Sequence, residues 1–586
     1  MLDVSGVGRT LVSQSGEGPK KRNNYSLDHG LAFPHNLLLF FATRASSFGR
    51  KPQPLMRESV SHSFQAIRMN WSARRQTKTI QSLLAGGLGI IVVYPILRLT
   101  ALEWSSGLYI GLAALSRLAV FFCWFQLAGY WYFRFRSRLE RKTSSRFPEE
   151  LRTTPPVAIL IPIRNEPITV IRRMFVHLQQ IQYSPLSIVV VDNSSLPQHE
   201  ALTNLAQELA VPSLTVVRKP TCRGFKAGAL NQALSTLGTD VRYALVLDID
   251  HAPGPQILHA LVPHLEADPA LAFVQAPQVY ETQGKSLVGS AFCFKQRVFY
   301  AHICPGLSAA GCMFMSGSNT LIRLTALRDV GGFDESSLTE DLRTTLRLHS
   351  RGWKGLYTPQ VVATGYAPMN FAGYHKQLRR WAIGTFQNWR AAASLLLESP
   401  SSLSTEQWLF YIGWNGLFYL QGIVVYLLVI VSAALLYVQP AALAPILDSS
   451  LAIGLLVTVA ATWIHERNAC GTRMVMIGAS SALFYGDLAI MVTAFADLLL
   501  KRRIVFEVTP KAQTRYGGPT SWFVVFHLLM PFLLMLGALR AGSFGSWLSG
   551  PAGTLWPAML LVQSGVIGII GMAARLSRND HGAQSA

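Results

Sequence analysis

Hydrophobic residues gather in runs of two lengths along this 586-residue chain. The long runs are about 20 residues or more, which is enough for a helix to cross a bilayer. The short runs are strand-sized and alternate with amphipathic stretches. We therefore expect an α/β region that is flanked by six membrane-spanning helices. The expected spans cover residues 79–100, 107–133, 409–437, 446–463, 521–540 and 555–574.

Basic residues set the expected orientation of these spans. The linkers at 101–106, 438–445 and 543–554 lack Lys and Arg, whereas the stretches at 134–146 and 465–473 are rich in them. Lys and Arg concentrate in cytoplasmic loops of membrane proteins. We therefore expect a multi-pass protein of the inner or plasma membrane, with its α/β region and both termini in the cytoplasm.

The two ends of the chain differ from its middle. Residues 1–78 are basic, carry Gly, Ser and Asn, and show no sustained hydrophobic period, so we expect a disordered cytoplasmic arm. Nothing in this arm resembles a cleavable signal peptide. Residues 576–586 form an expected cytoplasmic tail.

The apolar stretch at 476–500 has two interpretations. It is long enough to cross the membrane, but both of its flanks are basic and it carries Asp487 and Asp497. A carboxylate inside a bilayer is costly. We therefore favour a helix that lies at the cytoplasmic interface, with a seventh span as the alternative.

Short apolar runs between residues 150 and 400 predict the buried strands of an α/β region with a mainly parallel sheet. Amphipathic stretches between them predict helices. The predicted strands read VAILIPI, SIVVVD, LTVVRK, YALVLDID and LAFVQAP. With the spans added, the expected regions are 79–135, 150–400, 405–465, 474–516 and 520–575.

Composition supports a membrane protein. Half of the residues are hydrophobic, 14% are charged, and the mean hydropathy is +0.28. The 52 Lys and Arg residues outnumber the 31 Asp and Glu residues, which would suggest nucleic acid in a soluble chain. Because the basic residues lie beside the spans, we expect no nucleic-acid partner. The six cysteines form no C-x-x-C pair, which disfavours a zinc site or a disulfide framework.

Acidic residues end two of the predicted strands. Asp192 closes the second strand, and ligands of open α/β sheets bind at the carboxyl ends of strands. Its carboxylate could accept hydrogen bonds from a nucleoside or merely cap the next turn. Asp248 and Asp250 are two residues apart in YALVLDID, so on a strand they would share one face. Such a pair suits Mg²⁺ or Mn²⁺ bound beside phosphates, and a solvated strand end is the alternative.

Two later patterns add an acidic pair and a helix with cationic and aromatic residues. Glu340 and Asp341 open an amphipathic stretch, where they could be favourable helix-terminus charges or supply a general base. Arg380 could bind a diphosphate bidentately, and Trp381 offers a flat face to a sugar ring. Gln377 lies four residues before Trp381 and shares its helix face. An interfacial helix with an aromatic anchor is the alternative.

In this order, the patterns resemble the processive family 2 glycosyltransferases, and most closely the bacterial cellulose synthase catalytic subunit. The shared series is D…DxD…TED…QxxRW, and the resemblance extends over about residues 150–540. It implies a cytoplasmic GT-A (Rossmann-like) catalytic domain at 150–400. It also implies an interfacial helix and a gating loop at 474–516. Further matching blocks are IPIRNEP, GFKAGALN, FYAHICPG, MSGSNTLIR, GGFDESSLTED, LRLHSRGWKGLY and FEVTPK.

The resemblance also implies a role for each matching residue. The residues implied to contact the UDP moiety are Glu166, Asp192, Lys226 and Asp248. The implied metal ligands are Asp248 and Asp250, and the implied base is Asp341, next to Glu340. The implied acceptor and diphosphate end contains Ser316, Gln377, Arg380 and Trp381. The residues implied to close over bound nucleotide are Phe506, Thr509 and Lys511. Arg379 has no role in this scheme beyond interfacial anchoring.

Three features depart from the bacterial cellulose enzyme. Met315 and Ser316 stand where that family usually carries a Cys beside the acceptor, which opens a different donor or linkage. Two spans precede the catalytic region, and not four. The chain ends about a dozen residues after its last expected span, so we expect no PilZ domain for direct binding of cyclic-di-GMP.

The resemblance therefore predicts an inverting, processive synthase that makes a cellulose- or curdlan-like β-glucan from UDP-glucose. The growing polysaccharide would leave through the spans of the lipid bilayer, which is compatible with a periplasmic or export partner. Two alternatives stay open. One is a synthase that uses UDP-N-acetylglucosamine, and the other is a membrane transporter or sensor whose glycosyltransferase-like domain is inactive.

Overall fold

The computed structural model describes residues 107–143, 153–221, 223–282, 286–424, 427, 462, 464–467 and 474–502. Several expected features lie outside these ranges and stay predictions. They are the arm, the tail, the gating-loop residues Phe506, Thr509 and Lys511, and all or nearly all of the spans at 79–100, 446–463, 521–540 and 555–574.

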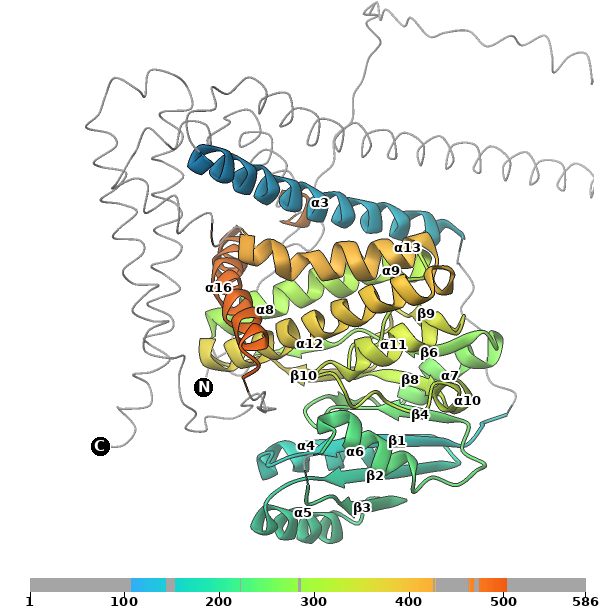
Figure 1. Cartoon of the computed structure of the whole chain (residues 1–586). Coiled ribbons are helices and arrows are strands. Elements are labelled where there is room, and N and C mark those ends of the chain that lie inside the picture. The colour runs from blue at the N-terminus through green and yellow to red at the C-terminus, as the bar shows by residue number, and fades with distance from the viewer. Residues whose placement is uncertain are drawn as a thin grey trace, which may run out of the picture. The chain divides into compact units, whose positions relative to one another are not determined.

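A seven-stranded sheet forms the centre of the α/β region, with the strand order β3-β2-β1-β4-β8-β6-β9 (Figure 1). Its neighbouring strands are parallel, except that β8 runs antiparallel to both β4 and β6. The predicted α/β fold with a mainly parallel sheet is confirmed. The strands are β1 (Val157–Ile163), β2 (Leu186–Asp192), β3 (Leu214–Arg218), β4 (Tyr243–Val246), β6 (Leu271–Gln275), β8 (Thr320–Arg323) and β9 (Lys354–Tyr357).

A smaller sheet joins two segments that matter for the site. Its order is β5 (Ala252–Pro253), β10 (Ala363–Tyr366) and β7 (Val279–Glu281). Strand β5 directly follows the loop that carries Asp248 and Asp250, and β10 precedes helix α12. The small sheet therefore fixes that loop relative to the start of α12.

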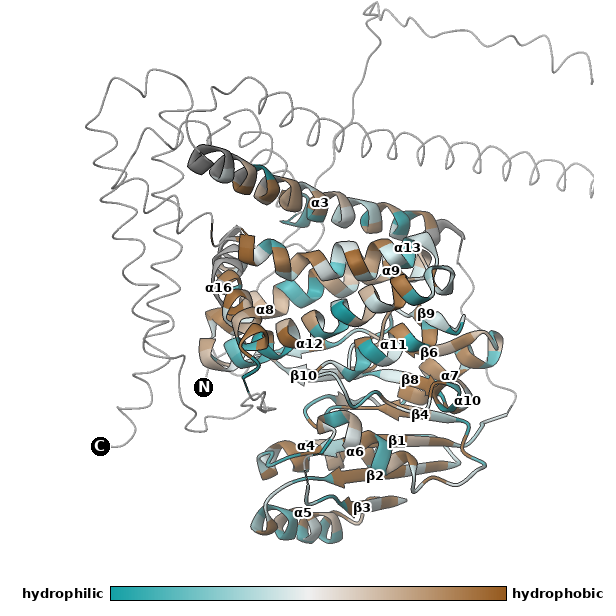
Figure 2. Cartoon of the chain, viewed as in Figure 1, coloured by the Kyte–Doolittle hydropathy of each residue, from teal (hydrophilic) through white to brown (hydrophobic). Residues whose placement is uncertain are grey.

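Helices cover both faces of the large sheet because its buried strands are apolar on both sides. In β1, Ala158 and Leu160 point into one core, and Ile159 and Ile161 point into the other. Hydrophobic residues accordingly dominate β1 and β2 in Figure 2. The helices of the α/β region are α4 (Ile168–Leu178), α5 (Leu196–Leu209), α6 (Phe225–Leu234), α7 (Ile257–Ala267), α8 (Leu287–Val298), η2 (Phe299–Ile303), α9 (Cys304–Ala309), α10 (Leu324–Asp329), α11 (Glu340–Ser350) and α12 (Phe371–Glu398).

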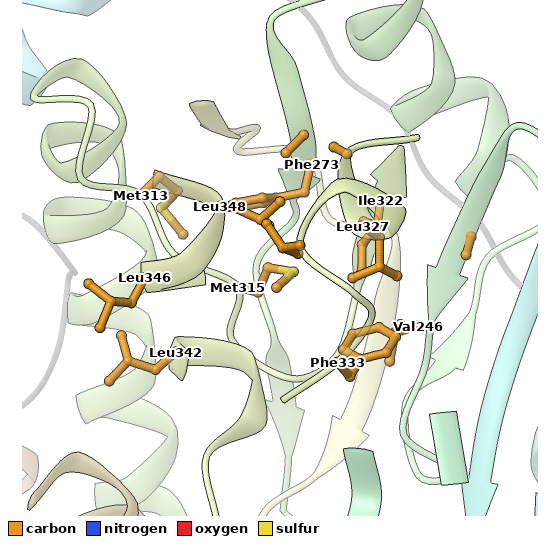
Figure 3. Close-up of a cluster of buried hydrophobic side chains, with 14 of the residues drawn as sticks. Val246, Phe273, Met313, Met315, Ile322, Leu327, Phe333, Leu342, Leu346 and Leu348 are labelled. Carbon is orange, nitrogen blue, oxygen red and sulfur yellow. The ribbon is translucent and has the colours of Figure 1, made fainter. Parts of the chain in front are cut away.

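The apolar side of α11 anchors this helix in the core. Leu342, Leu346 and Leu348 belong to a buried cluster that also contains Met315 and Ile322 (Figure 3). All five side chains are at most 5% exposed. Burial of such side chains is worth about 1.5–3 kcal/mol each. The start of α11, with Glu340 and Asp341, is therefore held firmly against the sheet.

Helix α3 (Gly107–Thr143) continues ten residues beyond the span that is expected at 107–133. It packs closely on α9 at Gly306. A Cβ atom at this position would lie only 1.9 Å from the carbonyl oxygen of Phe133, so only glycine fits there. The basic stretch that follows is helical to Thr143, and Arg134 in it is only 7% exposed. The sequence predicted only that this stretch is basic and cytoplasmic, and its cytoplasmic location stays a prediction.

Further described helices follow α12 along the chain. They include η3 (Pro400–Ser402), α13 (Thr405–Trp408), η4 (Leu409–Trp414) and α16 (Met474–Leu499). Helix α16 is mostly hydrophobic (Figure 2) and packs against α8 and α12. Within the described ranges, no helix combines the length and the apolar character that crossing a membrane requires.

Candidate active site

One cavity gathers most of the residues predicted to do chemistry. It lies where β1 and β4 end and where α11 begins, and α12 closes one side of it. Eleven predicted site residues fall within the described ranges, and ten of them line the cavity. These ten are Glu166, Lys226, Asp248, Asp250, Ser316, Glu340, Asp341, Gln377, Arg380 and Trp381.

Asp248 and Asp250 lie in a loop, and not on the strand that the sequence predicted. Strand β4 ends at Val246. The backbone then turns, with the His251 N–H donating to the Asp248 carbonyl, and the Asp248 N–H donates to Ser318 Oγ at 3.0 Å. The strand expectation is therefore wrong at these two positions. The turn nevertheless brings the two carboxylates close together.

Asp248, Asp250 and His251 form a candidate site for a divalent cation. One ligand atom from each residue lies within 4.8 Å of the other two. His251 is 2% exposed, and neither of its ring nitrogens has a hydrogen-bond partner in the described part of the chain. Its Nδ1 lies 3.6 Å from Asp250 Oδ1. A buried imidazole beside a carboxylate, with no hydrogen bond from either ring nitrogen, suits a metal ligand. Sequence reasoning missed His251, although it directly follows the second aspartate.

Lys226 places a positive charge among the carboxylates. Its Nζ lies 2.6 Å from Asp248 Oδ1 and 3.6 Å from Glu340 Oε1, and it donates to the Gly317 carbonyl at 2.6 Å. Burial alone would lower the pKa of this amine, but the two carboxylates outweigh that effect and raise the pKa. Lys226 therefore stays charged and joins the aspartate loop to the start of α11.

Asp341 occupies the first turn of α11, as predicted, and faces the cavity. Burial raises its pKa to about 7, and the negative charge of Glu340 adds to this rise while Lys226 opposes it. The Oδ2 atom would lie 3.1 Å from a Cβ atom on Gly317, whose φ is +86°. A glycine therefore permits this close backbone approach. A carboxyl group that titrates near neutrality is well suited to act as a general base.

Gln377, Arg380 and Trp381 reach the cavity from α12, so the predicted helix and the shared face of Gln377 and Trp381 are confirmed. The Trp381 ring stacks on Phe292, with ring centroids 6.5 Å apart. Gln377 Oε1 is buried without a hydrogen-bond partner among the described residues. A ligand hydroxyl could satisfy it, since a buried acceptor without a partner is costly.

Asp192 is the predicted residue that the structure does not bring to the cavity. Its side chain is fully buried, with Oδ1 accepting from the Ser194 N–H at 3.0 Å and Oδ2 lying 2.7 Å from His199 Nδ1. The carboxylate therefore shapes the turn after β2, which is the capping alternative. Its neighbour Asn193 lines the cavity instead. A nucleotide contact by Asp192 stays a prediction.

Tyr366 lines the cavity but belongs to no motif in the sequence. The Arg173 guanidinium lies 4.2 Å from the centre of its ring and donates to Thr364 Oγ1 at 3.2 Å. One face of the ring is thus covered by a cation. Strand pairing between β10 and β7 brings Tyr366 to the site, and no local sequence signal marks such a pairing.

Comparisons with known proteins show which families the chain is similar to. Residues 243–464 match the profile of the family described as "Glycosyl transferase family group 2". The chain is 28% identical to "Cellulose synthase catalytic subunit [UDP-forming]" of Komagataeibacter sucrofermentans, over 42% of this chain and 33% of that protein. The identity is also 28% with the protein of the same name from Xanthomonas axonopodis pv. citri, over 44% of this chain and 35% of that protein.

A third relative is "Putative cellulose synthase 2" of Komagataeibacter xylinus, with 28% identity over 54% of this chain and 21% of that protein. The chain thus matches at most about a third of the length of these relatives. Among solved structures, the mannosyltransferase PcManGT from Pyrobaculum calidifontis, in complex with GDP-Man and Mn²⁺, aligns with a TM-score of 0.47 and 20% identity. That alignment covers 67% of this chain and 100% of the mannosyltransferase.

The segment matched by the family profile includes α8, α11 and α12. Asp248, Asp250, Asp341 and the α12 residues of the cavity all lie inside the matched segment. The family resemblance that the sequence predicted is confirmed. Residues 243–464 of this chain are therefore similar to family 2 glycosyltransferases, and its relatives include cellulose synthase catalytic subunits.

Proposed function

We propose that this chain is a membrane-embedded, inverting and processive β-glycosyltransferase that polymerises glucose from UDP-glucose into a β-glucan. One observation carries the proposal. Asp341, whose pKa is raised to about 7, lies in the same cavity as a metal-type carboxylate pair and as the Gln377, Arg380 and Trp381 side chains of α12. A transfer reaction needs all three of these parts in one place.

The donor end would be built by the aspartate loop. Asp248 and Asp250, together with His251, would hold Mg²⁺ or Mn²⁺, whose ligand preferences include carboxylate oxygens and imidazole. The bound cation would supply charge neutralisation for a diphosphate. Lys226 and Arg380 add fixed positive charges in the same cavity, where a UDP leaving group gains negative charge.

The acceptor end would be built by α12. The Trp381 ring is supported by Phe292 and can stack on a sugar, and Gln377 can bind one of its hydroxyl groups. Asp341 would take the proton from the attacking hydroxyl, and the hydroxyl oxygen would form the new bond to the anomeric carbon. The bond from this carbon to the UDP oxygen would break at the same time, so a single displacement inverts the configuration.

The membrane part of the proposal rests on the sequence. The expected spans and the basic loops place the catalytic region on the cytoplasmic side of the inner or plasma membrane. The polysaccharide would then leave through the spans, in cooperation with a periplasmic or export partner where an outer membrane has to be crossed. The cellulose synthase names of the relatives support a glucan product.

The test uses the full-length protein in lipid vesicles with Mg²⁺. Radiolabelled UDP-glucose and UDP-N-acetylglucosamine are supplied in parallel, and any polymer is digested with linkage-specific glucanases. We expect a glucanase-sensitive polymer from UDP-glucose only. Polymer from UDP-N-acetylglucosamine alone would replace the proposed donor, and nucleotide binding without any transfer would favour an inactive domain.

The matched control for this test is Asp341→Asn, which keeps the shape of the side chain but cannot accept a proton. Loss of a general base typically costs about 10²- to 10⁴-fold in rate. We expect a loss of this size in polymer formation, with UDP affinity retained. Equal polymer formation by the variant would remove Asp341 from the proposed chemistry.

A further inference from the structure

Helix α16 carries two carboxylates on an otherwise mostly apolar helix, and both of them contact protein. Asp487 is 1% exposed, and the side chain of Asp497 is 13% exposed. A charge that is buried without a partner is very costly. The partners of these two residues therefore show what α16 is built to hold.

Asp487 joins three helices at one point. Its Oδ2 lies 2.6 Å from Lys295 Nζ on α8, and its Oδ1 accepts a hydrogen bond from the Tyr374 hydroxyl on α12 at 2.6 Å. Lys295 Nζ also lies 2.8 Å from the Tyr374 hydroxyl oxygen. The three side chains thus form a closed polar triangle inside apolar surroundings.

Asp497 makes a second contact with α12. Its Oδ2 lies 2.5 Å from Arg379 Nη2, and its Oδ1 lies 3.2 Å from Arg502 Nη1. The Arg502 side chain is 68% exposed, whereas that of Arg379 is 29% exposed. Arg379 is therefore the inner partner of this carboxylate, and Arg502 is the solvent-facing one.

Apolar packing fills the space between the two polar contacts. Leu483 and Ile490 of α16 share a buried cluster with Tyr374 and Phe292, the residue on which Trp381 stacks. Met491 and Ala494 belong to a second cluster that includes Ala382 and Ile383 of α12. The interface of α16 with α12 therefore continues past the positions that line the cavity.

The two polar contacts fix the rotation of α12 about its axis. Tyr374 and Arg379 are five residues apart, which places them about 140° apart around a helix of 3.6 residues per turn. Gln377 lies between them along the chain, and Trp381 follows two residues after Arg379. A turn of α12 about its axis would break at least one of these two contacts, and it would also change the direction of the cavity-lining side chains.

We propose that Asp487 and Asp497 are positioning residues, which hold α12 so that Gln377 and Trp381 face the acceptor in the cavity. This inference rests on the proposed glycosyl transfer and deepens it. The donor side has its own supports in Lys226, Asp248 and the sheet, so loss of the α16 contacts affects the acceptor end selectively.

The experiment compares Asp497→Asn and Asp487→Asn with wild-type protein in vesicles. Three quantities are measured: UDP-glucose affinity, release of glucose to water, and transfer of glucose to the growing polymer. We expect transfer to polymer to fall about 10- to 100-fold, because small misplacements of reacting groups have effects of this size. UDP-glucose affinity and release to water should stay within about twofold of wild type.

Matched variants separate positioning from general destabilisation. Asp497→Glu keeps the charge and should restore most of the transfer, and Arg502→Gln removes only the exposed partner and should change nothing. Tyr374→Phe combined with Asp487→Asn should lose no more than Asp487→Asn alone, because both changes remove the same contact. A parallel fall of transfer, donor affinity and melting temperature would overturn the proposal, as would unchanged transfer in both Asn variants.

A structural readout keeps the inference testable if the wild-type chain shows no transfer. Amide hydrogen exchange is measured over residues 374–384 in wild type, Asp497→Asn and Arg502→Gln. We expect faster exchange in Asp497→Asn only. Equal exchange in all three proteins would show that α16 does not restrain α12, whatever reaction the cavity performs.

Discussion

The donor end and the acceptor end of the cavity are held in different ways. At the donor end, Asp248 and Lys226 stand beside the central sheet and contact each other at 2.6 Å. At the acceptor end, Gln377 and Trp381 lie on α12, which is anchored by a helix that comes much later in the chain. The contact between Arg379 and Asp497 joins residues 118 positions apart.

This difference matches the proposed reaction. The donor end would receive the same nucleotide in each cycle, so charges that compensate one another within the core suit it. The acceptor end would have to release and rebind the end of a growing chain. Support by a separate helix allows its geometry to be set, and changed, without disturbing the donor end.

Among the variants considered, Lys226→Met is expected to reduce transfer the most. The change removes the positive charge shared by Asp248 and Glu340, and it also removes the charge that holds down the pKa of Asp341. We expect transfer at pH 7 to fall about 100-fold, within the usual range for a group that sets acid–base and charge balance. Measurement of transfer and of UDP-glucose affinity should show both reduced.

The matched control is Lys219→Met, whose amine donates to the Gly228 carbonyl at 2.7 Å and does not line the cavity. Lys219→Met should keep transfer close to wild type. Equal losses in the two variants would mean that Lys226 acts through the stability of α6 alone.

A smaller effect that is confined to the acceptor end is expected from Trp381→Ala. Loss of one stacking contact typically weakens binding by about tenfold, which corresponds to about 1.4 kcal/mol. We expect the concentration of acceptor needed for half-maximal transfer to rise by this factor, with UDP-glucose affinity unchanged. Trp381→Phe keeps a ring against Phe292, so its half-maximal acceptor concentration should lie between those of wild type and Trp381→Ala. A loss of donor affinity instead would place Trp381 at the wrong end of the cavity.

The smallest effect is expected from Arg172→Gln. Arg172 pairs with Glu208 at 2.7 Å on the surface between α4 and α5, and both side chains are about half exposed. Exposed ion pairs contribute little because water and salt screen them. Transfer and melting temperature should match wild type, and a clear loss of transfer would show that α4 and α5 influence the cavity.

The sequence predicted the parts of the site that depend on local pattern. Short apolar runs predicted the positions of β1, β2, β3 and β6. The adjacent Glu340 and Asp341 before an amphipathic stretch predicted the start of α11. The end of β4 was missed, because the apolar pattern continues through Leu247 and Ile249 after the strand has ended at Val246.

Other parts depend on contacts that no single-sequence pattern records. The Asp192 carboxylate contacts His199, which comes seven residues later on α5. This contact holds the carboxylate away from the cavity. The partners of Asp487, and Arg379 as the inner partner of Asp497, lie more than a hundred residues before them. From the sequence these two carboxylates suggested only that 476–500 avoids the bilayer, and the structure adds that they hold α8 and α12.

The pH dependence of transfer tests most sharply whether Asp341 accepts the proton of the attacking hydroxyl. The groups that set its pKa are Glu340 and Asp248, which raise it, and Lys226 and the Leu342 N–H, which lower it, together with burial as the largest cause. A base must be ionised to act, so the rate should rise as pH increases through about 7 and then level off.

The measurement is single-turnover transfer from UDP-glucose between about pH 5.5 and 8.5, with donor affinity followed separately, in wild type and in Asp341→Asn. We expect a rise with a midpoint near pH 7 in wild type. In Asp341→Asn we expect a slow and pH-independent rate, with donor affinity similar in both proteins. A flat profile in wild type, or the same rise in the variant, would contradict the claim that Asp341 is the base.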